Sequence, residues 1–250
     1  MKLSDRLERI AAKAAGVTEG YAADVGTDHG FVPIRLIESG KVKHVVAMDV
    51  RKGPLERACE HVEEYHMEDQ IETRLSDGLK ELKPGEADTV IIAGMGGELI
   101  IKILENGRHM WDSVSQWVLS PQSEIFKVRR WLFENGFVIR KEEMVLEDGK
   151  FYTVMDVRRE KDADSEGKTV DPDVLSLSED SRMLYGDYLI RTKNPVLLTY
   201  LKEEEAKLLR FIEDLSAKAG DSERAAERLS ELKLQLKENQ EVQHEMQGDH

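Results

Sequence analysis

The sequence predicts an α/β protein in which a doubly wound, Rossmann-like sheet precedes a C-terminal α-helical hairpin. From Tyr21 onward, short apolar runs alternate with longer amphipathic patterns, which is typical of βαβ units and a parallel sheet. Nearer the end of the chain, two stripes of leucines are separated by a Gly-Asp-Ser break, which is typical of an antiparallel helix pair of coiled-coil character. We therefore expect two domains, residues 1–159 and residues 160–250.

The first domain is expected to alternate strands and helices behind a leading helix. That helix, over Leu3–Ala15, places its apolar residues on one face, with Ser4 as its N-cap and Gly16 as its stop. The expected strands are Tyr21–Val25, His44–Asp49, Ile71–Leu75, Thr89–Ala93 and Trp117–Ser120. The expected helices that accompany them are Val32–Ser39, Pro54–Tyr65, Glu98–Glu105 and Glu124–Asn135.

After Gly136 the pattern changes to short strands. Apolar runs over residues 137–139, 144–146 and 151–157, placed around the Glu-Asp-Gly-Lys turn at 147–150, predict a hairpin that closes the sheet. The stretch Arg158–Asp173 is charged and almost free of large apolar residues, so we expect a linker or an exposed loop there.

The second domain is expected to be helical. A short helix is expected over Ser178–Ile190, and Asn194 with Pro195 supplies the N-cap and the first residue of a long helix. Glu205 interrupts the apolar seam of that helix, and the tail beyond Lys237 is expected to fray. The seam residues are Leu198, Leu201, Leu208, Ile212 and Leu215 in the first long helix, and Ala225, Leu229, Leu232 and Leu236 in the second.

The composition sets limits on the function. With 250 residues and a hydrophobic fraction of 40%, the chain can bury a substantial core. It has no apolar run of about 18 residues and a polar N-terminus, so we expect a cytoplasmic protein that spans no membrane. The lone cysteine, Cys59, excludes a disulfide framework and a thiolate metal cluster. The net charge of −14, concentrated in the C-terminal third, argues against a uniformly basic nucleic-acid binder and restricts such a surface to a local patch.

The main chemical signal is the loop after the first strand, residues 24–30 (Asp-Val-Gly-Thr-Asp-His-Gly). In a doubly wound sheet, ligands bind beyond the carboxyl ends of the strands, where Gly26 and Gly30 let the chain approach a ligand closely. A dinucleotide fingerprint has glycine where this loop has Asp28, and a carboxylate there repels pyrophosphate. With Asp24 as a second carboxylate, the loop favours a cationic ligand that resembles an amino acid.

Three further strand ends carry acidic or glycine-rich sequences. Asp49 ends the second strand, 23 residues after Gly26, where a carboxylate commonly accepts the ribose hydroxyls of a nucleoside. Asp77 follows the third strand, and the Gly-Met-Gly-Gly sequence at 94–97 follows the fourth, where it would let a substrate approach the reactive centre. Because these ends share one edge of the expected sheet, we expect a cofactor of the nucleoside type.

Each of these features also has a purely structural interpretation. An aspartate at a strand end is commonly a helix N-cap, and residues 94–97 can form a tight connection. His29 alone is more typical of a loop hydrogen bond than of a catalyst. The occurrence of all of them at four strand ends favours a cofactor site over these separate explanations.

The same residues resemble a known family. Residues 24–33 (Asp-Val-Gly-Thr-Asp-His-Gly-Phe-Val-Pro) are similar to that family's Asp-Ile-Gly-Ser-Asp-His-Ala-Tyr-Leu-Pro, residues 94–97 match its second hallmark, and residues 3–7 resemble its leading helix. The family is the bacterial tRNA adenine-N1 methyltransferases, which modify adenine 22 in the D-arm. The resemblance implies a class I methyltransferase sheet that uses S-adenosyl-L-methionine, followed by a coiled-coil hairpin. This chain departs from the family after the fifth strand, where Gln122-Ser123-Glu124 replaces Gln-Pro-Asn.

The resemblance and the chemistry of methyl transfer together imply roles for individual residues. N1 of an unpaired adenine has to lie in line with the sulfonium methyl group, and the methylated base carries a positive charge. Asp28, with His29 beside it, is the expected catalytic pair. Gly96, Gly97 and Gln122 are expected on the substrate side, and no metal is required. The residues expected to hold S-adenosyl-L-methionine are Asp24, Gly26, Thr27, Gly30, Asp49, Asp77, Gly94 and Met95.

Other functions fit the same sequence. One is a methyltransferase for a small molecule or a protein, and another is a non-catalytic nucleotide-binding module whose hairpin recruits partners. Asp28 disfavours a nicotinamide-dependent oxidoreductase. We expect tRNA as the partner, and a monomer rather than an oligomer. Two basic groups either contact RNA phosphates or are ordinary solvated helix charges: Arg6, Arg9 and Lys13, and Lys127, Arg129 and Arg130.

Overall fold

The computed structural model describes residues 3–16, 19–159, 177–218 and 223–248. The chain divides into two compact units, which span residues 1–169 and 170–250. The boundary between these units lies outside the described residues, and so does most of the linker expected over Arg158–Asp173. The predicted domain boundary after residue 159 therefore stays a prediction.

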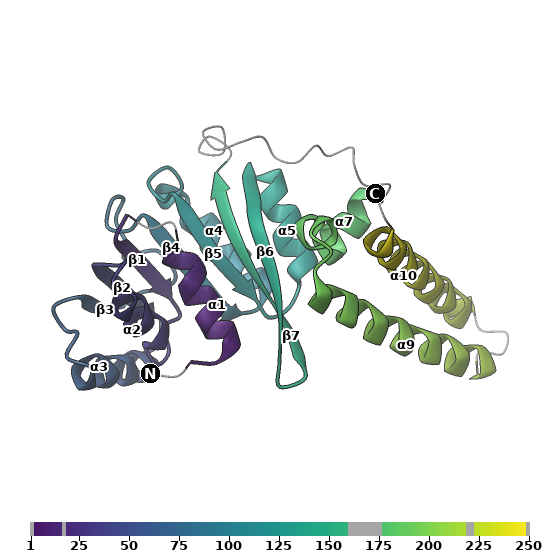
Figure 1. Ribbon diagram of the computed structural model, residues 1–250, viewed down its shortest axis with the longest axis horizontal. Helices are drawn as coiled ribbons and strands as arrows, with labels where there is room; N and C mark the ends of the chain where they lie inside the picture. Colours follow the sequence, from purple (N-terminus) through teal and green to yellow (C-terminus); the bar gives the residue numbers. More distant parts are fainter. Residues whose placement is uncertain (1–2, 17–18, 160–176, 219–222, 249–250) are drawn as a thin grey trace. The chain divides into compact units, whose positions relative to one another are not determined.

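A seven-stranded sheet forms the centre of the first unit (Figure 1). Its strands are β1 (Tyr21–Val25), β2 (His44–Asp49), β3 (Ile71–Leu75), β4 (Thr89–Met95), β5 (Gln116–Pro121), β6 (Phe137–Glu147) and β7 (Lys150–Arg159). They run in the order β3-β2-β1-β4-β5-β7-β6, in which β1 to β5 are parallel and β7 is antiparallel to both of its neighbours. The Rossmann-like α/β fold and the hairpin that closes the sheet are thus confirmed.

Helices cover both faces of this sheet. They are α1 (Asp5–Ala14), α2 (Phe31–Glu38), α3 (Lys52–Glu64), α4 (Gly97–Asn106), the short 3-10 helix η1 (Arg108–Met110) and α5 (Ile125–Glu134). Neighbouring strand residues point to opposite faces, so Ile91 packs in the layer of α1, α2 and α3 while Ile92 packs in the layer of α4 and α5. The two apolar layers hold the sheet between them and leave the carboxyl ends of its parallel strands as one shared edge.

The hairpin that closes the sheet has a two-residue turn. Asp148 and Gly149 both have positive φ, 49° and 72°, which suits the tight turn that joins twisted antiparallel strands. β6 is one strand of 11 residues instead of the two short runs expected, because a register shift between Ile139 and Lys141 is absorbed within it. The first two residues of the expected linker, 158 and 159, instead end β7.

The described residues of the second unit are helical (Figure 1). They form α7 (Glu179–Tyr185), α8 (Asp187–Arg191), α9 (Pro195–Lys218) and α10 (Glu223–Gln247). Asn194 caps α9 as predicted, because its Oδ1 accepts hydrogen bonds from the backbone N–H groups of Val196 at 2.9 Å and Leu197 at 3.1 Å. Gly186, at φ 93°, divides the single helix expected over 178–190 into α7 and α8. Within the described ranges of both units, no helix is long and apolar enough to cross a membrane.

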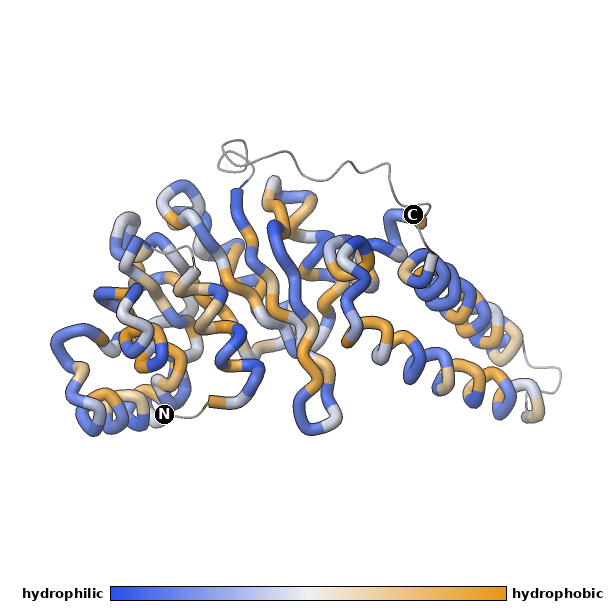
Figure 2. Tube along the Cα trace, in the orientation of Figure 1, coloured by the Kyte–Doolittle hydropathy of each residue, from blue (hydrophilic) through white to orange (hydrophobic). Residues whose placement is uncertain are grey.

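α9 and α10 pack side by side as the predicted hairpin (Figure 1). Figure 2 shows hydrophobic and hydrophilic residues alternating along α9, as a helix with one apolar face requires. Leu197 is more buried than Leu198, which was expected in the seam. Three of the expected seam leucines are buried: Leu201, Leu208 and Leu232. The coiled-coil character of the pair stays a prediction.

The expectation that the chain frays beyond Lys237 is wrong. α10 continues as a regular helix through this region, and Val242 is completely buried in it. A polar contact also joins this region to α9: Nδ2 of the buried Asn239 donates to the carbonyl of Leu201 at 3.1 Å and to the carboxylate of Glu204 at 2.8 Å. The residues after Lys237 are therefore polar in composition but form the packed end of a helix.

Candidate active site

The loop between β1 and α2 folds tightly against β2 at the carboxyl edge of the sheet. The backbone N–H groups of Gly26 and Thr27 both donate to the carbonyl of Met48, at 2.7 and 2.9 Å. Gly26 and Gly30 have φ values of 83° and 70°, a left-handed conformation that glycine adopts without steric cost. Gly30 then begins α2 as its N-cap residue. The two glycines predicted from the motif therefore shape this turn.

Two aspartates, Asp24 and Asp49, are buried on the neighbouring strands β1 and β2. Their exposed fractions are 5% and 6%. Burial raises the pKa of Asp24 to about 7, while the Thr27 hydroxyl opposes this shift and the charge of Asp49 adds to it. Asp49 Oδ1 accepts a hydrogen bond from the backbone N–H of Arg51 at 2.8 Å. A buried carboxylate that resists ionisation is suited to a ligand that brings a positive charge.

Asp28, the expected catalytic carboxylate, lies on the outside of the loop and is ion-paired. Its side chain is 52% exposed, its φ is 41°, and its Oδ1 lies 2.5 Å from Nη2 of Arg57 on α3. Nε2 of His29 lies 3.7 Å from Oδ2 of Asp28. The structure thus brings the predicted pair together and adds Arg57, which the sequence analysis missed.

His29 also belongs to a cluster of three rings with Phe31 and His61. The ring centroids of His29 and Phe31 are 5.2 Å apart, and those of Phe31 and His61 are 4.9 Å apart. Nδ1 of His61, on α3, lies 2.8 Å from the carbonyl oxygen of His29. Nδ1 of His29 is buried and has no hydrogen-bond partner in the part of the chain that the structure describes. The cluster fixes the position of the His29 ring next to Asp28.

β4 ends across a β-bulge, where the sequence analysis expected a glycine-rich turn. The register with β5 shifts between Ala93 and Met95, and Gly94 between them has a φ of 77°. A Cβ atom on Gly26 would lie 2.1 Å from Cε of Met95, so the Met95 side chain covers the backbone of Gly26. The backbone N–H of Gln122, just after β5, donates to the carbonyl of Met95 at 2.9 Å. Residues from three strand ends therefore meet here.

Gly96 and Gly97 pack against the loop that follows β5. The N–H of Gly97 donates to the carbonyl of Ser123 at 3.0 Å and to the carboxylate of Glu124 at 3.1 Å. The Ser123 hydroxyl and this N–H group lower the pKa of Glu124. A Cβ atom on Gly97 would lie 2.7 Å from the Ser123 carbonyl oxygen, so glycine is needed here for packing. The carboxylate of Glu124 thus accepts a hydrogen bond from the first residue of α4, a role that was not predicted from the sequence.

Two exposed apolar residues, Val50 and Leu75, lie at the ends of β2 and β3. They are 59% and 45% exposed, and Leu75 is the register partner of Asp49. Neither residue was predicted from the sequence, although apolar residues at exposed strand ends are a usable signal. Asp77, which was expected to join the cofactor site, is exposed and pairs with Lys80, which lowers its pKa. Asp77 therefore has a cationic partner of its own, and its place in the cofactor site stays a prediction.

The two basic groups considered for RNA contact are largely engaged within the first unit. On α1, Lys13 and Arg9 both pair with Glu143 of β6, at 2.7 and 3.2 Å. On α5, Arg129 is buried against Glu142 at 2.7 Å. These contacts favour the structural interpretation of both groups. The remaining contacts are Arg6 over the ring of Tyr152, Lys127 with Glu98, and Arg130 over the ring of Phe126.

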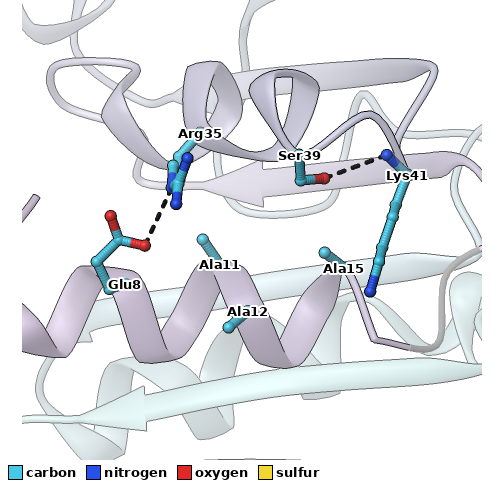
Figure 3. A pocket seen from close by; sticks show the side chains of 7 residues that line it. All are labelled: Glu8, Ala11, Ala12, Ala15, Arg35, Ser39 and Lys41. Carbon is cyan, nitrogen blue, oxygen red and sulfur yellow. Dashed lines mark hydrogen bonds and ion pairs between the residues drawn. The ribbon is translucent and has the colours of Figure 1, made fainter. Parts of the chain in front are cut away.

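A separate pocket lies between α1 and α2 (Figure 3). Nε of Arg35 donates to the carboxylate of Glu8 at 3.0 Å across it, and Ser39 Oγ accepts a hydrogen bond from the backbone N–H of Lys41 at 3.2 Å. Its lining contains none of the strand-end residues described above, so it is not the candidate cofactor site. The lining residues are Glu8, Ala11, Ala12, Ala15, Arg35, Ser39 and Lys41.

Comparisons with known proteins agree with this geometry. Residues 3–155 match a family model described as a methyltransferase domain. A tRNA (adenine(22)-N(1))-methyltransferase from Bacillus subtilis is 33% identical over 233 residues, which are 93% of each chain. The chain belongs to the bacterial tRNA (adenine-22, N1)-methyltransferase family.

Solved structures related to this family share the fold along almost the whole chain. The crystal structure of the B. subtilis tRNA methyltransferase has 31% identity and a TM-score of 0.80, covering 97% of this chain and 99% of that one. A Streptococcus pneumoniae protein, a candidate tRNA methyltransferase of the same specificity, was crystallised with S-adenosyl-L-methionine. It has 28% identity and a TM-score of 0.79, covering 97% of this chain and 100% of that one. The family resemblance seen in residues 24–33 and 94–97 is confirmed.

Proposed function

We propose that this chain transfers the methyl group of S-adenosyl-L-methionine to N1 of adenine 22 in tRNA. The main support is the carboxyl edge of the sheet, where loop 24–30 lies next to the buried Asp24. The chain is also 33% identical to a B. subtilis enzyme named for this reaction. The S. pneumoniae protein, similar along the same length, binds this methyl donor in its crystal structure.

We assign the cofactor to the part of the edge around Asp24. S-adenosyl-L-methionine carries an ammonium group and a sulfonium centre, and the Asp24 carboxylate has no ion-pair partner among the described residues. We assign Asp49 to the ribose hydroxyls, and the exposed Val50 and Leu75 to the apolar face of the flat adenine ring, on the basis of their burial and register. We leave Asp77 out because it pairs with a lysine. The site is completed by Gly26, Thr27, Gly30, Gly94 and Met95.

Methyl transfer to N1 requires mainly that the protein position the adenine against the methyl group and stabilise the charge that develops on the base. The sulfonium supplies an electrophilic methyl group, so the protein has to hold the N1 lone pair in line with it. N1 is engaged in pairing within a duplex, so the adenine has to be unpaired or turned out of the stack. The positive charge that develops on the base is stabilised by the Asp28 carboxylate, with His29 beside it. Gly96, Gly97 and Gln122 line the substrate side.

The proposed substrate determines the partner and the compartment. We infer tRNA as the macromolecular partner and the cytoplasm as the place of action, since the described residues hold no membrane-spanning helix and tRNA is the substrate named for the relative. The basic side chains of α1 and α5 are engaged with acidic or aromatic side chains, which favours RNA contact through other positive residues as well. We propose a monomer as the active form.

A labelled-donor assay tests the proposed reaction. The protein is incubated with S-adenosyl-L-methionine labelled in the methyl group and with bulk bacterial tRNA, and the RNA is then digested to nucleosides. The expected product is labelled N1-methyladenosine. Absence of label from the RNA contradicts the proposal. Label on added small molecules or proteins would indicate a different methyltransferase, and binding without any transfer would indicate a non-catalytic module.

The role of Asp28 has its own test. Asp28→Ala is expected to abolish methyl transfer, because the charge on the methylated base then lacks its carboxylate. Binding of S-adenosyl-L-methionine, measured by calorimetry, and the far-UV circular dichroism spectrum are expected to be retained, because the Asp28 side chain is exposed and pairs with Arg57, whereas Asp24 and Asp49 are buried. A fully active Asp28→Ala variant would remove this residue from the mechanism.

A further inference from the structure

Three residues on one face of α3 contact the loop that carries the proposed catalytic pair. Nη2 of Arg57 lies 2.5 Å from Oδ1 of Asp28, and Nδ1 of His61 lies 2.8 Å from the carbonyl oxygen of His29. Between them, Ala58 approaches so closely that a Cβ atom on Gly30 would lie 3.3 Å from its Cβ atom. Positions 57, 58 and 61 fall on one side of a helix, so α3 meets three consecutive loop residues.

The loop needs this support because its backbone is strained. Asp28 has a φ of 41°, in a region that residues with a side chain rarely adopt, and it lies between two glycines of positive φ. The hydrogen bonds from Gly26 and Thr27 to Met48 tie the first half of the loop to β2. The second half is tied by the side chains of α3. Each half of the loop is therefore held by a different element.

We propose that Arg57 and His61 are positioning residues that hold Asp28 and His29 in place for methyl transfer, an inference that rests on the function proposed above. Arg57 fixes the direction of the Asp28 carboxylate, and its fork of N–H donors suits that task. His61 fixes the backbone of His29 and stacks at 4.9 Å on Phe31, whose other neighbour at 5.2 Å is the His29 ring.

This arrangement separates catalysis from cofactor binding. Of the residues assigned to the cofactor, those at the ends of β1, β2 and β4 contact each other through Gly26, Met48 and Met95, while Gly30 approaches α3 at Ala58, which the substitution of Arg57 leaves in place. Loss of Arg57 is therefore expected to misdirect Asp28 without changing affinity for the methyl donor. Misplacement of a catalytic group by about 1 Å can reduce the rate by about 100-fold.

The test compares Arg57→Gln, Arg57→Lys and the matched control Arg35→Gln, which breaks the ion pair of Arg35 with Glu8 outside the site. Arg57→Gln is expected to lower kcat for tRNA methylation by roughly 10- to 100-fold, with KM for S-adenosyl-L-methionine unchanged. Arg57→Lys is expected to recover part of this loss, because it restores the charge but not the fork. Arg35→Gln is expected to match the wild type. An unchanged kcat in Arg57→Gln, or a change confined to KM, would overturn the proposal.

A double variant tests whether Arg57 acts through Asp28. If it does, Arg57→Gln combined with Asp28→Asn is expected to be no slower than Asp28→Asn alone when the residual rates are measured in single turnovers with excess enzyme, because no carboxylate is left to hold. Additive losses would show that Arg57 acts by another route and would overturn the proposal.

Hydrogen exchange tests the positioning independently of the reaction. The backbone N–H groups of residues 28–31 are expected to exchange faster in Arg57→Gln and in His61→Ala than in the wild type, while those of β1 and of Gly26 and Thr27 stay unchanged. Unchanged exchange in this loop would overturn the proposal even if the enzyme is active. Faster exchange in a protein that methylates no tRNA would instead show that the loop support is real and that the proposed function is wrong.

Discussion

At the scale of single residues, Asp24 is a carboxylate of the candidate site whose charged form is destabilised by burial. Burial raises its pKa from 3.8 to about 7, and the nearby charge of Asp49 adds to the shift. Below this pKa the side chain is mostly a neutral acid, and above it mostly a carboxylate. A cationic methyl donor binds the carboxylate better, so its binding competes with a proton.

We therefore predict that the Kd for S-adenosyl-L-methionine rises as the pH falls from 8 to 6, approaching about tenfold per pH unit below the pKa of Asp24. The Kd rises on acidification because protonation of Asp24 removes the negative charge that attracts the ligand. Calorimetric titration at several pH values measures the effect. Asp24→Asn is expected to bind weakly with a flat profile in this range. A wild-type Kd that is constant from pH 8 to pH 6 would contradict this role of Asp24.

Glycine packing gives a second prediction for single residues. Gly97→Ala is expected to lower the free energy of unfolding by about 1–3 kcal/mol, because overpacking displaces backbone. The added Cβ atom would lie 2.7 Å from the carbonyl oxygen of Ser123 and 2.9 Å from that of Glu124. Gly53→Ala is the matched control in α3, where the nearest atom would be 4.0 Å away. There, helix propensity is expected to raise the free energy of unfolding by about 0.5–1 kcal/mol.

Urea denaturation followed by circular dichroism measures both glycine variants. Equal effects of Gly97→Ala and Gly53→Ala would contradict the close packing of the β4 and β5 ends.

The sequence predicted those site residues whose role is local. Gly26 and Gly30 follow from the motif, because a turn at a strand end needs left-handed backbone. Arg57 could not be found in the same way. It follows Asp28 by 29 residues, and only the packing of α3 beside the loop brings the two together. The cofactor role predicted for Asp77 stays a prediction, because a strand-end position does not fix where a side chain points.

Between elements, a buried ion pair joins α5 to β6. Arg129 and Glu142 are 3% and 1% exposed, and Nε and Nη2 of Arg129 lie 3.0 and 2.7 Å from Oε1 of Glu142. Glu142→Leu is expected to lower the free energy of unfolding by about 3–5 kcal/mol, because it removes a carboxylate partner from a buried guanidinium. Arg129→Met combined with Glu142→Leu is expected to recover most of this loss. Urea denaturation measures both variants, and a loss below about 1 kcal/mol in the single variant would contradict the importance of this pair.

The elements themselves differ in how far the sequence could predict them. β1, β2 and β3 appear with the expected bounds. β1 and β2 are mostly buried and largely apolar, as strands covered on both faces are, whereas the edge strand β3 buries only Ile71. The end of α10 was missed because its packing depends on a partner elsewhere in the chain. Asn239 is buried through a contact with Glu204, 35 residues earlier, and no local pattern around Asn239 contains that information.

For the whole molecule, the order of the strands determines where the chemistry takes place. Because β1 to β5 are parallel, residues from Asp24 to Glu124 are brought to one edge of one sheet. The alternation of strands and helices was sufficient to predict this edge from sequence. The proposed specificity for adenine 22 rests on the family relationship, because no distance measured within the first unit identifies the target base.

Mapping the methylated position tests the central claim most directly. The protein is incubated with S-adenosyl-L-methionine and a tRNA transcript that carries adenine at position 22, and with a matched transcript that carries guanine there. Mass spectrometry of nuclease fragments then locates the added methyl group. We predict one methyl group on N1 of adenine 22 in the first transcript and none in the second. Methylation at another position, or equal methylation of both transcripts, would contradict the account.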